Sequence, residues 1–437
     1  MIGNHGTVGL ARRFGTPQHV IHERRLARTA TEYLHAATSS YKGTANVHFA
    51  VKCNSVPAVI ETILAAGLGL EVMTECELAL ALRLGCDPNR IIVNGPCKTE
   101  SFLRDCLAAG VRLTIVDSID ELLELDALAS ATGCVADILL RINPDYIPRG
   151  MNRGTATASR KGCAFGLDLA GGEAVRALEI LDGLSAVRFR GIHFHLGTGI
   201  RSAEEYARAI QRLVPLFRII QDKGGRIEIL DVGGGFASPT TRELSTKEML
   251  MYQVLNRLPE LGEVLNNCPI ERYTSVVSRA VEGEFSAGFL PEIIYEPGRS
   301  IASSNQLLLL TVRRVKERPG AGRWLIADGG LSTVTLPTYY EYHEVFLCND
   351  VRRPRVTRAT IIGPACFAGD IVYRNKLLPD VSQGEVLAIM DSGAYFTALE
   401  SSFGFPRPAI VAVNGAHCRL VRSRETFDEM IERDILD

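Results

Sequence analysis

The stretch IEILDVGGGF, residues 227–236, joins an apolar run to three consecutive glycines. The run Ile227–Val232 is rich in branched aliphatic side chains, which is typical of a strand buried on both faces. The glycines that follow are a turn signal, and they allow a backbone to approach another group closely. We therefore interpret the stretch as a buried β-strand that ends in a tight turn.

Seven more apolar runs of similar length occur between residues 45 and 300, separated by longer stretches of helical period such as Ala58–Ala66 and Glu204–Ile220. Eight alternating βα units predict a closed (β/α)8 barrel. An open Rossmann-type sheet is the alternative, but no G-x-G-x-x-G motif opens a helix after the first strand. The other runs are Val47–Lys52, Leu68–Met73, Ile91–Asn94, Leu113–Asp117, Asp137–Asn143, Gly191–His195 and Ile293–Glu296.

Beyond about residue 303 the pattern changes to short β-like runs separated by turns, which predicts a mainly β domain. We expect the barrel to span residues 26–302, and residues 1–25 to join 303–437 in a β-sandwich or barrel-like domain. The runs in question are Gln306–Val315, Trp324–Ala327, Ala359–Ile362, Glu385–Ile389 and Ala409–Val413.

The composition narrows the class of partner. The chain has 437 residues, 46% of them hydrophobic and 22% charged, and a formal net charge of −2. These values are typical of a globular protein and predict neither nucleic acid nor a membrane surface as partner. No apolar run is long enough to span a bilayer and Met1 to Arg13 has no signal-peptide pattern, so we expect a cytoplasmic protein. The 11 cysteines show no paired short spacing, so we expect reduced thiols and no metal site.

Polar and reactive residues fall at or near the predicted strand ends, where barrel enzymes place their active sites. Lys52 closes the first run, and a lysine in such a desolvated place becomes a usable nucleophile toward an aldehyde. A lysine that only snorkels from a strand end is the alternative for this residue taken alone. The other polar residues at strand ends are Glu71, Arg141, His195, Gly233, Gly234, Gly235 and Glu296.

The loops after the seventh and eighth strands carry the second signal. The glycine run follows the seventh strand, and Glu296-Pro-Gly-Arg299 follows the eighth. Barrel enzymes commonly hold a phosphate in these two loops, where backbone N–H groups and an arginine such as Arg299 can bind the anion. Together with Lys52, these loops indicate a ligand with an aldehyde at one end and a phosphate at the other.

On these residues the chain resembles the fold-type-III pyridoxal-phosphate (PLP) decarboxylases, the ornithine and diaminopimelate decarboxylase family. The resemblance runs over nearly the whole length. Its motifs are Ala50-Val-Lys-Cys-Asn54, Leu140-Arg-Ile-Asn143, Ala164-Phe-Gly166, His193-Phe-His-Leu-Gly-Thr198, Asp231-Val-Gly-Gly-Gly235, Glu296-Pro-Gly-Arg299, Asp328-Gly-Gly330, Gly363-Pro-Ala-Cys366 and Gly393-Ala-Tyr395.

The resemblance implies a role for each matching residue. Lys52 binds the PLP aldehyde covalently, His195 stacks on the pyridine ring and Glu296 pairs with the ring nitrogen. A carboxylate there keeps the nitrogen protonated, so that the ring accepts the electrons left by CO2. Cys366 comes from the second subunit and delivers a proton, which implies a homodimer with shared sites. Arg141 lies near the phenolic oxygen, and Thr198, Gly235, Gly298, Arg299 and Tyr395 surround the phosphate.

The chain departs from the family on the substrate side. The acidic residue that follows the family's cysteine and contacts a substrate amine is Phe367 here, which leaves Asp328 as the acidic group on that side. The arginine that precedes a proline in diaminopimelate enzymes, and holds the distal carboxylate, is Leu336 here. The family's lysine before Phe-Gly is Ala164, so its salt bridge to the residue matching Asp370 is missing.

The loop after the fifth strand offers positive charge instead, from Arg149, Arg153, Arg160 and Lys161. Basic loops are more often solvated than functional. Lost acidic and retained basic groups nevertheless favour an amino-acid substrate whose far end is non-basic or anionic. Within the family this resembles the branch of siderophore and other specialised pathways, where a citrate-conjugated diamino acid is decarboxylated, and we expect that function.

Other functions compete with this expectation. The chain could be a diaminopimelate decarboxylase with a rearranged pocket, an ornithine/lysine-type decarboxylase, or an amino-acid racemase on the same barrel. Cys366 and Asp328 argue against the racemase. A catalytically inactive regulatory homologue is the candidate from another class, and the retained Lys52, Glu296 and Arg299 argue against it.

Overall fold

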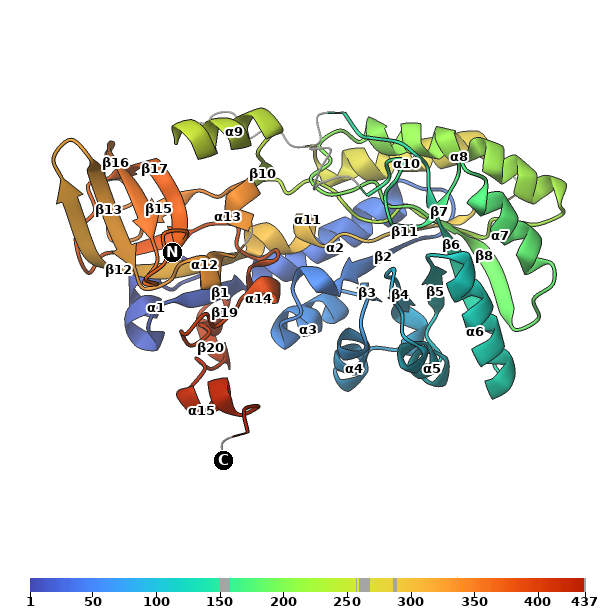
Figure 1. Cartoon of the computed structure of the whole chain (residues 1–437), viewed down its shortest axis with the longest axis horizontal. Helices are drawn as coiled ribbons and strands as arrows, with labels where there is room; N and C mark the ends of the chain where they lie inside the picture. The colour runs from blue at the N-terminus through green and yellow to red at the C-terminus, as the bar shows by residue number, and fades with distance from the viewer. Residues whose placement is uncertain (150–157, 257, 259–267, 286–288, 336, 436–437) are drawn as a thin grey trace. The chain divides into compact units, whose positions relative to one another are not determined.

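The computed structural model describes residues 1–149, 158–256, 258, 268–285, 289–335 and 337–435 (Figure 1). The chain forms two compact units. One unit comprises residues 27–237 and 267–300, and the other comprises residues 1–26, 238–266 and 301–437. The chain thus leaves its first unit twice, once between residues 237 and 267 and finally after residue 300.

Eight parallel strands close into a barrel in the unit of residues 27–237 and 267–300, which confirms the predicted fold class. Each strand pairs with the next in chain order, and the last, β11, pairs with the first, β2, through Ile293 opposite Ala45. The strands are β2 (Ala45–Ala50), β3 (Gly69–Val72), β4 (Ile91–Val93), β5 (Leu113–Val116), β6 (Ala136–Asn143), β8 (Val187–His193), β9 (Ile229–Asp231) and β11 (Glu292–Tyr295).

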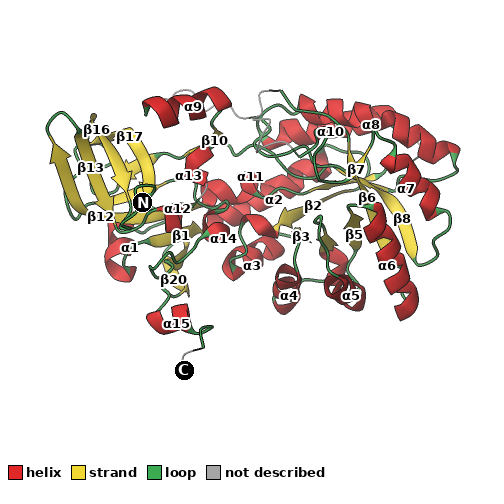
Figure 2. Cartoon of the chain, in the orientation of Figure 1, coloured by secondary structure: helices red, strands yellow, loops and turns green. Residues whose placement is uncertain are grey.

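Helices follow the strands and lie outside them, as Figure 2 shows for α6, α7 and α8. Helices α4, α5 and α6 begin after Thr74, Thr99 and Ser118, whose hydroxyls accept a backbone N–H of the first turn. The helices are α2 (Glu23–Ser39), α3 (Pro57–Ala65), α4 (Glu75–Arg83), α5 (Glu100–Ala109), α6 (Ile119–Thr132), α7 (Glu173–Leu181), α8 (Glu204–Asp222), α10 (Ile270–Glu284) and the short α11 (Arg299–Ala302).

The barrel interior is a packed core. Ile92, Ile115, Leu139, Ile229 and Ile294 are fully or almost fully buried and contact one another. These side chains come from five strands, so the middle of the barrel is closed by hydrocarbon. The polar residues are left at the strand ends, where a site can form.

The other unit is built on a mixed sheet. Strand β1 (Gln18–His22) lies between β12 (Gln306–Arg318), to which it is antiparallel, and β19 (Ala409–Asn414), to which it is parallel. The remaining strands of this sheet are β13 (Gly322–Ala327), β15 (Val345–Leu347), β16 (Arg355–Ile362), β17 (Ile371–Pro379), β18 (Val386–Ile389) and β20 (His417–Arg422).

Alternation along β12 gives this unit two apolar layers. Leu308 and Leu310 belong to one buried cluster, while Leu307 and Leu309 belong to another. Successive side chains of a strand point to opposite faces, so β12 packs on both sides. The smaller elements of this unit are β10 (Arg242–Glu243), β14 (Glu341–Tyr342), α1 (Thr7–Phe14), α9 (Thr246–Leu255), α12 (Leu331–Val334), α13 (Pro337–Tyr340), α14 (Phe396–Leu399) and α15 (Phe427–Ile431), whereas β7 (Leu167–Asp168) pairs with β6 in the barrel unit.

Within the described ranges, no helix combines the length and apolar character that crossing a bilayer requires.

Candidate active site

Lys52 lies just past the end of β2, in a single 3-10 turn formed by Val51–Cys53. Its Nζ donates to both carboxylate oxygens of Glu71, at 2.8 and 2.6 Å. The Lys52 side chain keeps 31% of its surface exposed, whereas that of Glu71 keeps 1%. The amine is therefore held in place and still accessible. Burial raises the pKa of Glu71, and the positive charge of Lys52 opposes that rise.

Glu296 follows β11 directly and lies beside two other buried side chains. Its Oε2 is 3.4 Å from His193 Nε2, and Asp231 lies next to both. His193 ends β8 and Asp231 ends β9, so three adjacent strands deliver the group. The sequence analysis named Glu296 but neither His193 nor Asp231 as a site residue.

His195 lies beyond the end of β8, not on the strand as the predicted run Gly191–His195 had it. The two histidines therefore lie in different environments. His193 is fully buried, whereas His195 is partly exposed. Its Nδ1 accepts the backbone N–H of Gly234 at 3.2 Å. Burial first, then the charges of Arg141 and Lys52, lower the pKa of His195 well below its usual value. The ring is neutral near pH 7.

Arg141 sits on β6 with a buried carboxylate and an aromatic ring as neighbours. Its Nη1 donates to Asp117 Oδ1 at 3.1 Å, and its guanidinium carbon lies 4.8 Å from the centre of the Phe165 ring. Asp117 also accepts the N–H of Gly166 at 3.1 Å. Asp117 was not among the predicted site residues, although its position at the end of a buried strand is a usable signal.

The glycines after β9 are required by close backbone approaches. Gly235 has φ +90°, and a Cβ on it would lie 2.1 Å from the carbonyl oxygen of Gly197. A Cβ on Gly298 would lie 2.9 Å from the Cβ of Cys53. No larger residue fits either position without a backbone shift. Nearby, the buried Arg299 donates through Nε to the Thr198 hydroxyl at 3.4 Å.

The other predicted residues lie in the unit that holds the mixed sheet. Cys366 and Phe367 are exposed, on the loop between β16 and β17. Tyr395 has φ +65° and precedes α14, with its carbonyl accepting the Thr335 hydroxyl at 3.2 Å. The structure does not bring these residues together with the barrel site in one unit.

Asp328 already has partners inside its own unit. Its carboxylate accepts the Thr16 hydroxyl at 2.6 Å and the Thr311 N–H at 2.9 Å, and it pairs with Arg313 at 2.8 Å. Arg149 is exposed, and its backbone N–H donates to Glu205. Arg153 and Leu336 lie outside the described residues.

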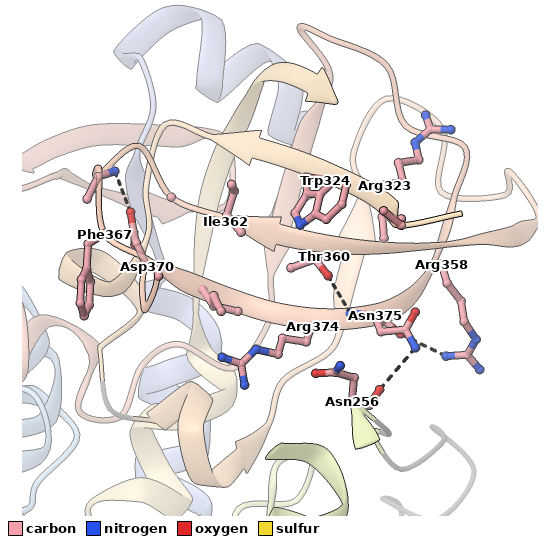
Figure 3. Close-up of a pocket in the computed structure, with 17 residues that line it drawn as sticks. Asn256, Arg323, Trp324, Arg358, Thr360, Ile362, Phe367, Asp370, Arg374 and Asn375 are labelled. Carbon is pink, nitrogen blue, oxygen red and sulfur yellow. Dashed lines mark hydrogen bonds between the residues drawn. The ribbon is translucent and has the colours of Figure 1, made fainter. Parts of the chain in front are cut away.

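Asp370 organises the loop that carries Cys366. Its carboxylate accepts the backbone N–H groups of Leu331 at 2.6 Å and Ala365 at 2.8 Å. In the family, a lysine pairs with the residue that matches Asp370, and Ala164 replaces that lysine here. Asp370 instead accepts hydrogen bonds from backbone groups near its own loop. Figure 3 shows Phe367 and Asp370 at one end of a pocket of about 600 Å³, with Trp324 and Arg374 further along it.

The residues at the barrel mouth fit a ligand with three different chemical groups. Lys52 offers an amine for an aldehyde, Arg299 and Thr198 offer donors for a phosphate, and Glu296 offers a buried carboxyl group for a ring nitrogen. This donor set suits PLP. The class of protein that the fold and the site define is therefore that of the barrel enzymes that bind PLP.

The chain belongs to the PLP-dependent decarboxylase family. Residues 27–303 match the model described as "Pyridoxal-dependent decarboxylase, pyridoxal binding domain". Residues 300–393 match "Pyridoxal-dependent decarboxylase, C-terminal sheet domain". The chain is therefore an enzyme of this class, with PLP as its cofactor.

The relatives of the chain indicate a more specific activity within this family. The chain is 30% identical to the diaminopimelate decarboxylase of Aquifex aeolicus, over 97% of this chain and 92% of that protein. It is 32% identical to that of Actinosynnema pretiosum, over 100% and 92%. The crystal structure of the Methanocaldococcus jannaschii diaminopimelate decarboxylase superposes with a TM-score of 0.86 at 26% identity, covering 99% of this chain and 94% of that one.

These relatives overturn the predicted function. We expected an amino acid with a non-basic or anionic far end, such as a citrate-conjugated diamino acid of a siderophore pathway, and this expectation is wrong. Proteins similar over the full length are diaminopimelate decarboxylases. The expectation rested on Leu336, Phe367 and the basic loop after the fifth strand, whereas the similarity to a diaminopimelate decarboxylase extends over 97% of the chain.

Proposed function

We propose that the protein decarboxylates diaminopimelate. The observation that carries the proposal is the similarity to diaminopimelate decarboxylases over the whole chain, at 30% identity for the Aquifex aeolicus enzyme. A second solved structure of the M. jannaschii enzyme, at 26% identity and a TM-score of 0.85, is a complex with L-lysine. Lysine is what remains when diaminopimelate loses one carboxylate, so a product-shaped ligand fits a relative of this fold.

The barrel residues would divide the work as follows. PLP, when bound, accepts the electron pair that the departing CO2 leaves on the α-carbon. Lys52 would hold the cofactor aldehyde and Glu71 would orient Lys52. The neutral His195 would pack against the pyridine ring, and Glu296 would pair with the ring nitrogen.

Arg299, Thr198 and the glycines Gly233, Gly234, Gly235 and Gly298 would bind the phosphate. Arg141, which pairs with Asp117, would bind the phenolic oxygen of the cofactor. Each assignment pairs a donor with an acceptor of opposite character, which is how a site fixes a multiply charged ligand.

The proposal also includes a homodimer. Cys366 would deliver its thiol proton to the α-carbon in a site of the partner chain, and Tyr395 would reach the partner's phosphate. We propose the domain division expected from the sequence, a cofactor domain within residues 26–302 and a second domain of residues 1–25 and 303–437, except that residues 238–266 group with the second domain. The similarity of relatives across both parts supports an enzyme that uses both.

At the far end of the substrate, Arg149 and Arg153 are the proposed partners of the distal carboxylate, since Leu336 replaces the family's arginine. Asp328 is held by Thr16, Thr311 and Arg313, so it has little capacity left for a substrate ammonium. Phe367 supplies no charge. The far end of the site is therefore expected to be selective for a substrate that brings its own carboxylate.

The test is a CO2-release assay on the purified holoenzyme with the stereoisomers of diaminopimelate, ornithine, lysine and arginine as separate substrates. Stoichiometric lysine and CO2 from one diaminopimelate isomer, with kcat/KM at least about a hundredfold above that of ornithine, is the expected result. The Lys52→Ala protein is the blank. Ornithine turned over faster than every diaminopimelate isomer would overturn the proposal.

A further inference from the structure

Glu296 is packed against two other buried side chains, His193 and Asp231. Pairing with the ring nitrogen of PLP does not by itself require these two neighbours. His193, Asp231 and Glu296 keep 0%, 0% and 3% of their surface exposed. His193 lies opposite Asp231 in the strand register, and Asp231 lies opposite Ile294, two residues before Glu296. A ring nitrogen of His193 and one carboxylate oxygen each of Asp231 and Glu296 lie within 4.8 Å of one another.

The hydrogen bonds of the two carboxyl groups are incomplete unless they share a proton. Asp231 Oδ1 accepts the Gly233 N–H at 2.8 Å. Asp231 Oδ2 and Glu296 Oε1 accept no hydrogen bond in the described part of the chain, although the two carboxyl groups are close neighbours. Two carboxylates without a donor between them repel strongly in such a place. A proton between them removes the repulsion and satisfies both oxygens.

The surroundings decide which of the two carries the proton. Burial and the neighbouring Glu296 raise the pKa of Asp231 well above its usual value, and Glu71 adds to this rise. Burial also raises the pKa of Glu296, but the positive charges of Lys52 and Arg141 oppose that rise. His193, buried and next to Arg141, has a pKa well below its usual value and brings no charge. The proton therefore belongs on Asp231.

We propose that Asp231 is a positioning residue, protonated at neutral pH, whose O–H donates to the Glu296 carboxylate and fixes its charge and direction. The inference rests on the proposed role of Glu296 toward the ring nitrogen of PLP. A carboxylate that receives an O–H bond is a weaker base, so Glu296 would take the ring proton less readily. The ring then stays in the form that accepts electrons.

The first test reads the proton directly. Infrared spectra of the wild-type protein at pH 8, with and without 13C-labelled aspartate, should show a carbonyl band of a protonated carboxyl group that shifts with the label. The band should disappear in Asp231→Asn. Asp117→Asn is the matched control, because Asp117 is a similarly buried aspartate at the same end of the barrel but pairs with Arg141, and there the band should remain. A band absent from the wild type, or retained in Asp231→Asn, overturns the proposal.

The second test compares two replacements of Asp231. Asparagine keeps a donor toward Glu296 and an acceptor for Gly233, whereas alanine removes both. Asp231→Ala should weaken PLP binding about tenfold or more and change the pH dependence of the absorption of bound PLP. Asp231→Asn should restore both toward wild type. Equal damage by the two replacements would show that a charged Asp231 is needed, which contradicts the proposal.

The same three side chains could instead hold a cation, since histidine and carboxylates are metal ligands. Elemental analysis of the purified protein distinguishes the two arrangements. One equivalent of metal that is lost in Asp231→Asn overturns the shared proton. The infrared band needs no substrate, so its presence together with failure of diaminopimelate turnover would refute the proposed function and leave this inference standing.

Discussion

Lys52 is the residue that we propose binds PLP covalently. We expect Lys52→Ala to abolish the borohydride-reducible link between protein and PLP, and to lower turnover by about three orders of magnitude or more, because the described structure places no other amine in contact with Glu71 at the mouth of β2. Absorbance spectra and CO2 release provide the measurements. Lys42→Ala, on an exposed lysine paired with Glu282, is the control and should leave both unchanged. A reducible link retained in Lys52→Ala would contradict the assignment.

A substitution of Glu296 can test the binding of PLP and the catalytic role of its ring nitrogen separately. In Glu296→Gln the phosphate donors Arg299 and Thr198 remain, so PLP should still bind, while turnover should fall about a hundredfold or more because the ring nitrogen loses its anionic partner. Glu292→Gln is a suitable control, since Glu292 begins β11, the strand that Glu296 follows, and pairs with Arg112. Near-normal turnover of Glu296→Gln would remove this residue from the mechanism.

Phe367 concerns the choice of substrate. Replacing it with aspartate should raise kcat/KM for ornithine about tenfold, because a carboxylate then faces an ammonium group that the wild-type site leaves unpaired. The matched control is Phe403→Asp, because the two rings contact each other at a centroid distance of 5.9 Å and both are exposed. Equal gains from both variants would mean that general surface charge is responsible. Efficient ornithine turnover by the wild type would refute the premise.

At the scale of the elements, the sequence was sufficient to locate the barrel strands. The predicted run Ile91–Asn94 contains β4, Leu113–Asp117 contains β5, and in each case the strand ends one residue before the predicted end. The reason is that parallel strands buried on both faces are continuous apolar runs with polar residues at their ends. Lys52 was predicted to close its strand, but the chain turns one residue after Ala50 and places it in a 3-10 turn.

The grouping of side chains across strands could not be predicted in the same way. His193 meets Asp231 because β8 and β9 pair in one register, and a shift by one residue would turn either side chain to the other face. Nothing in the local pattern states that register. The partners of Asp328 were equally inaccessible, since Thr16 lies 312 positions away in the chain.

The first turn of helix α4 contains a buried glutamate, Glu77, whose effect on stability depends on pH. Glu77 caps this end, accepting the N–H of Met73 at 2.8 Å, and burial raises its pKa to about 7. A carboxyl group with a raised pKa stabilises the fold at low pH, and this contribution is lost as the pH rises through about 7.

Glu77→Gln should therefore gain thermal stability over the wild type between pH 5 and pH 8, by at most roughly 3 kcal/mol. The measurement is the difference in Tm across that range. Glu75→Gln changes an exposed glutamate of the same turn whose pKa is lowered instead, and it should show no such gain. A pH-independent difference for Glu77→Gln would contradict the assignment.

At the scale of the whole molecule, single substitutions and the similarity of the complete chain indicate different substrates. Two substitutions, at positions 336 and 367, pointed away from diaminopimelate, whereas similarity extends over 97% of the chain to a diaminopimelate decarboxylase. A pocket can bind one ligand with several arrangements of side chains, so a substitution at one position does not by itself exclude a substrate.

The proposed homodimer can be tested through the two residues that would form one shared site. Lys52 belongs to the barrel unit, while Cys366 is exposed on a loop of the other unit, as a residue that serves a partner chain would be. An isologous dimer presents the same surface twice, so each chain can complete the site of the other. If so, Lys52→Ala and Cys366→Ala proteins are each inactive alone and complementary when combined.

Mixing the two variants in equal amounts and allowing subunits to exchange should restore about a quarter of wild-type activity, because half of the dimers are mixed and each mixed dimer has one intact site. CO2 release before and after exchange, with exchange followed by mass spectrometry of differently tagged chains, gives the measurement. Mixing Lys52→Ala with itself under the same conditions is the control. Recovery in the mixture alone requires that Lys52 and Cys366 of one site come from different chains, whereas demonstrated exchange without recovery would place both residues in the same chain.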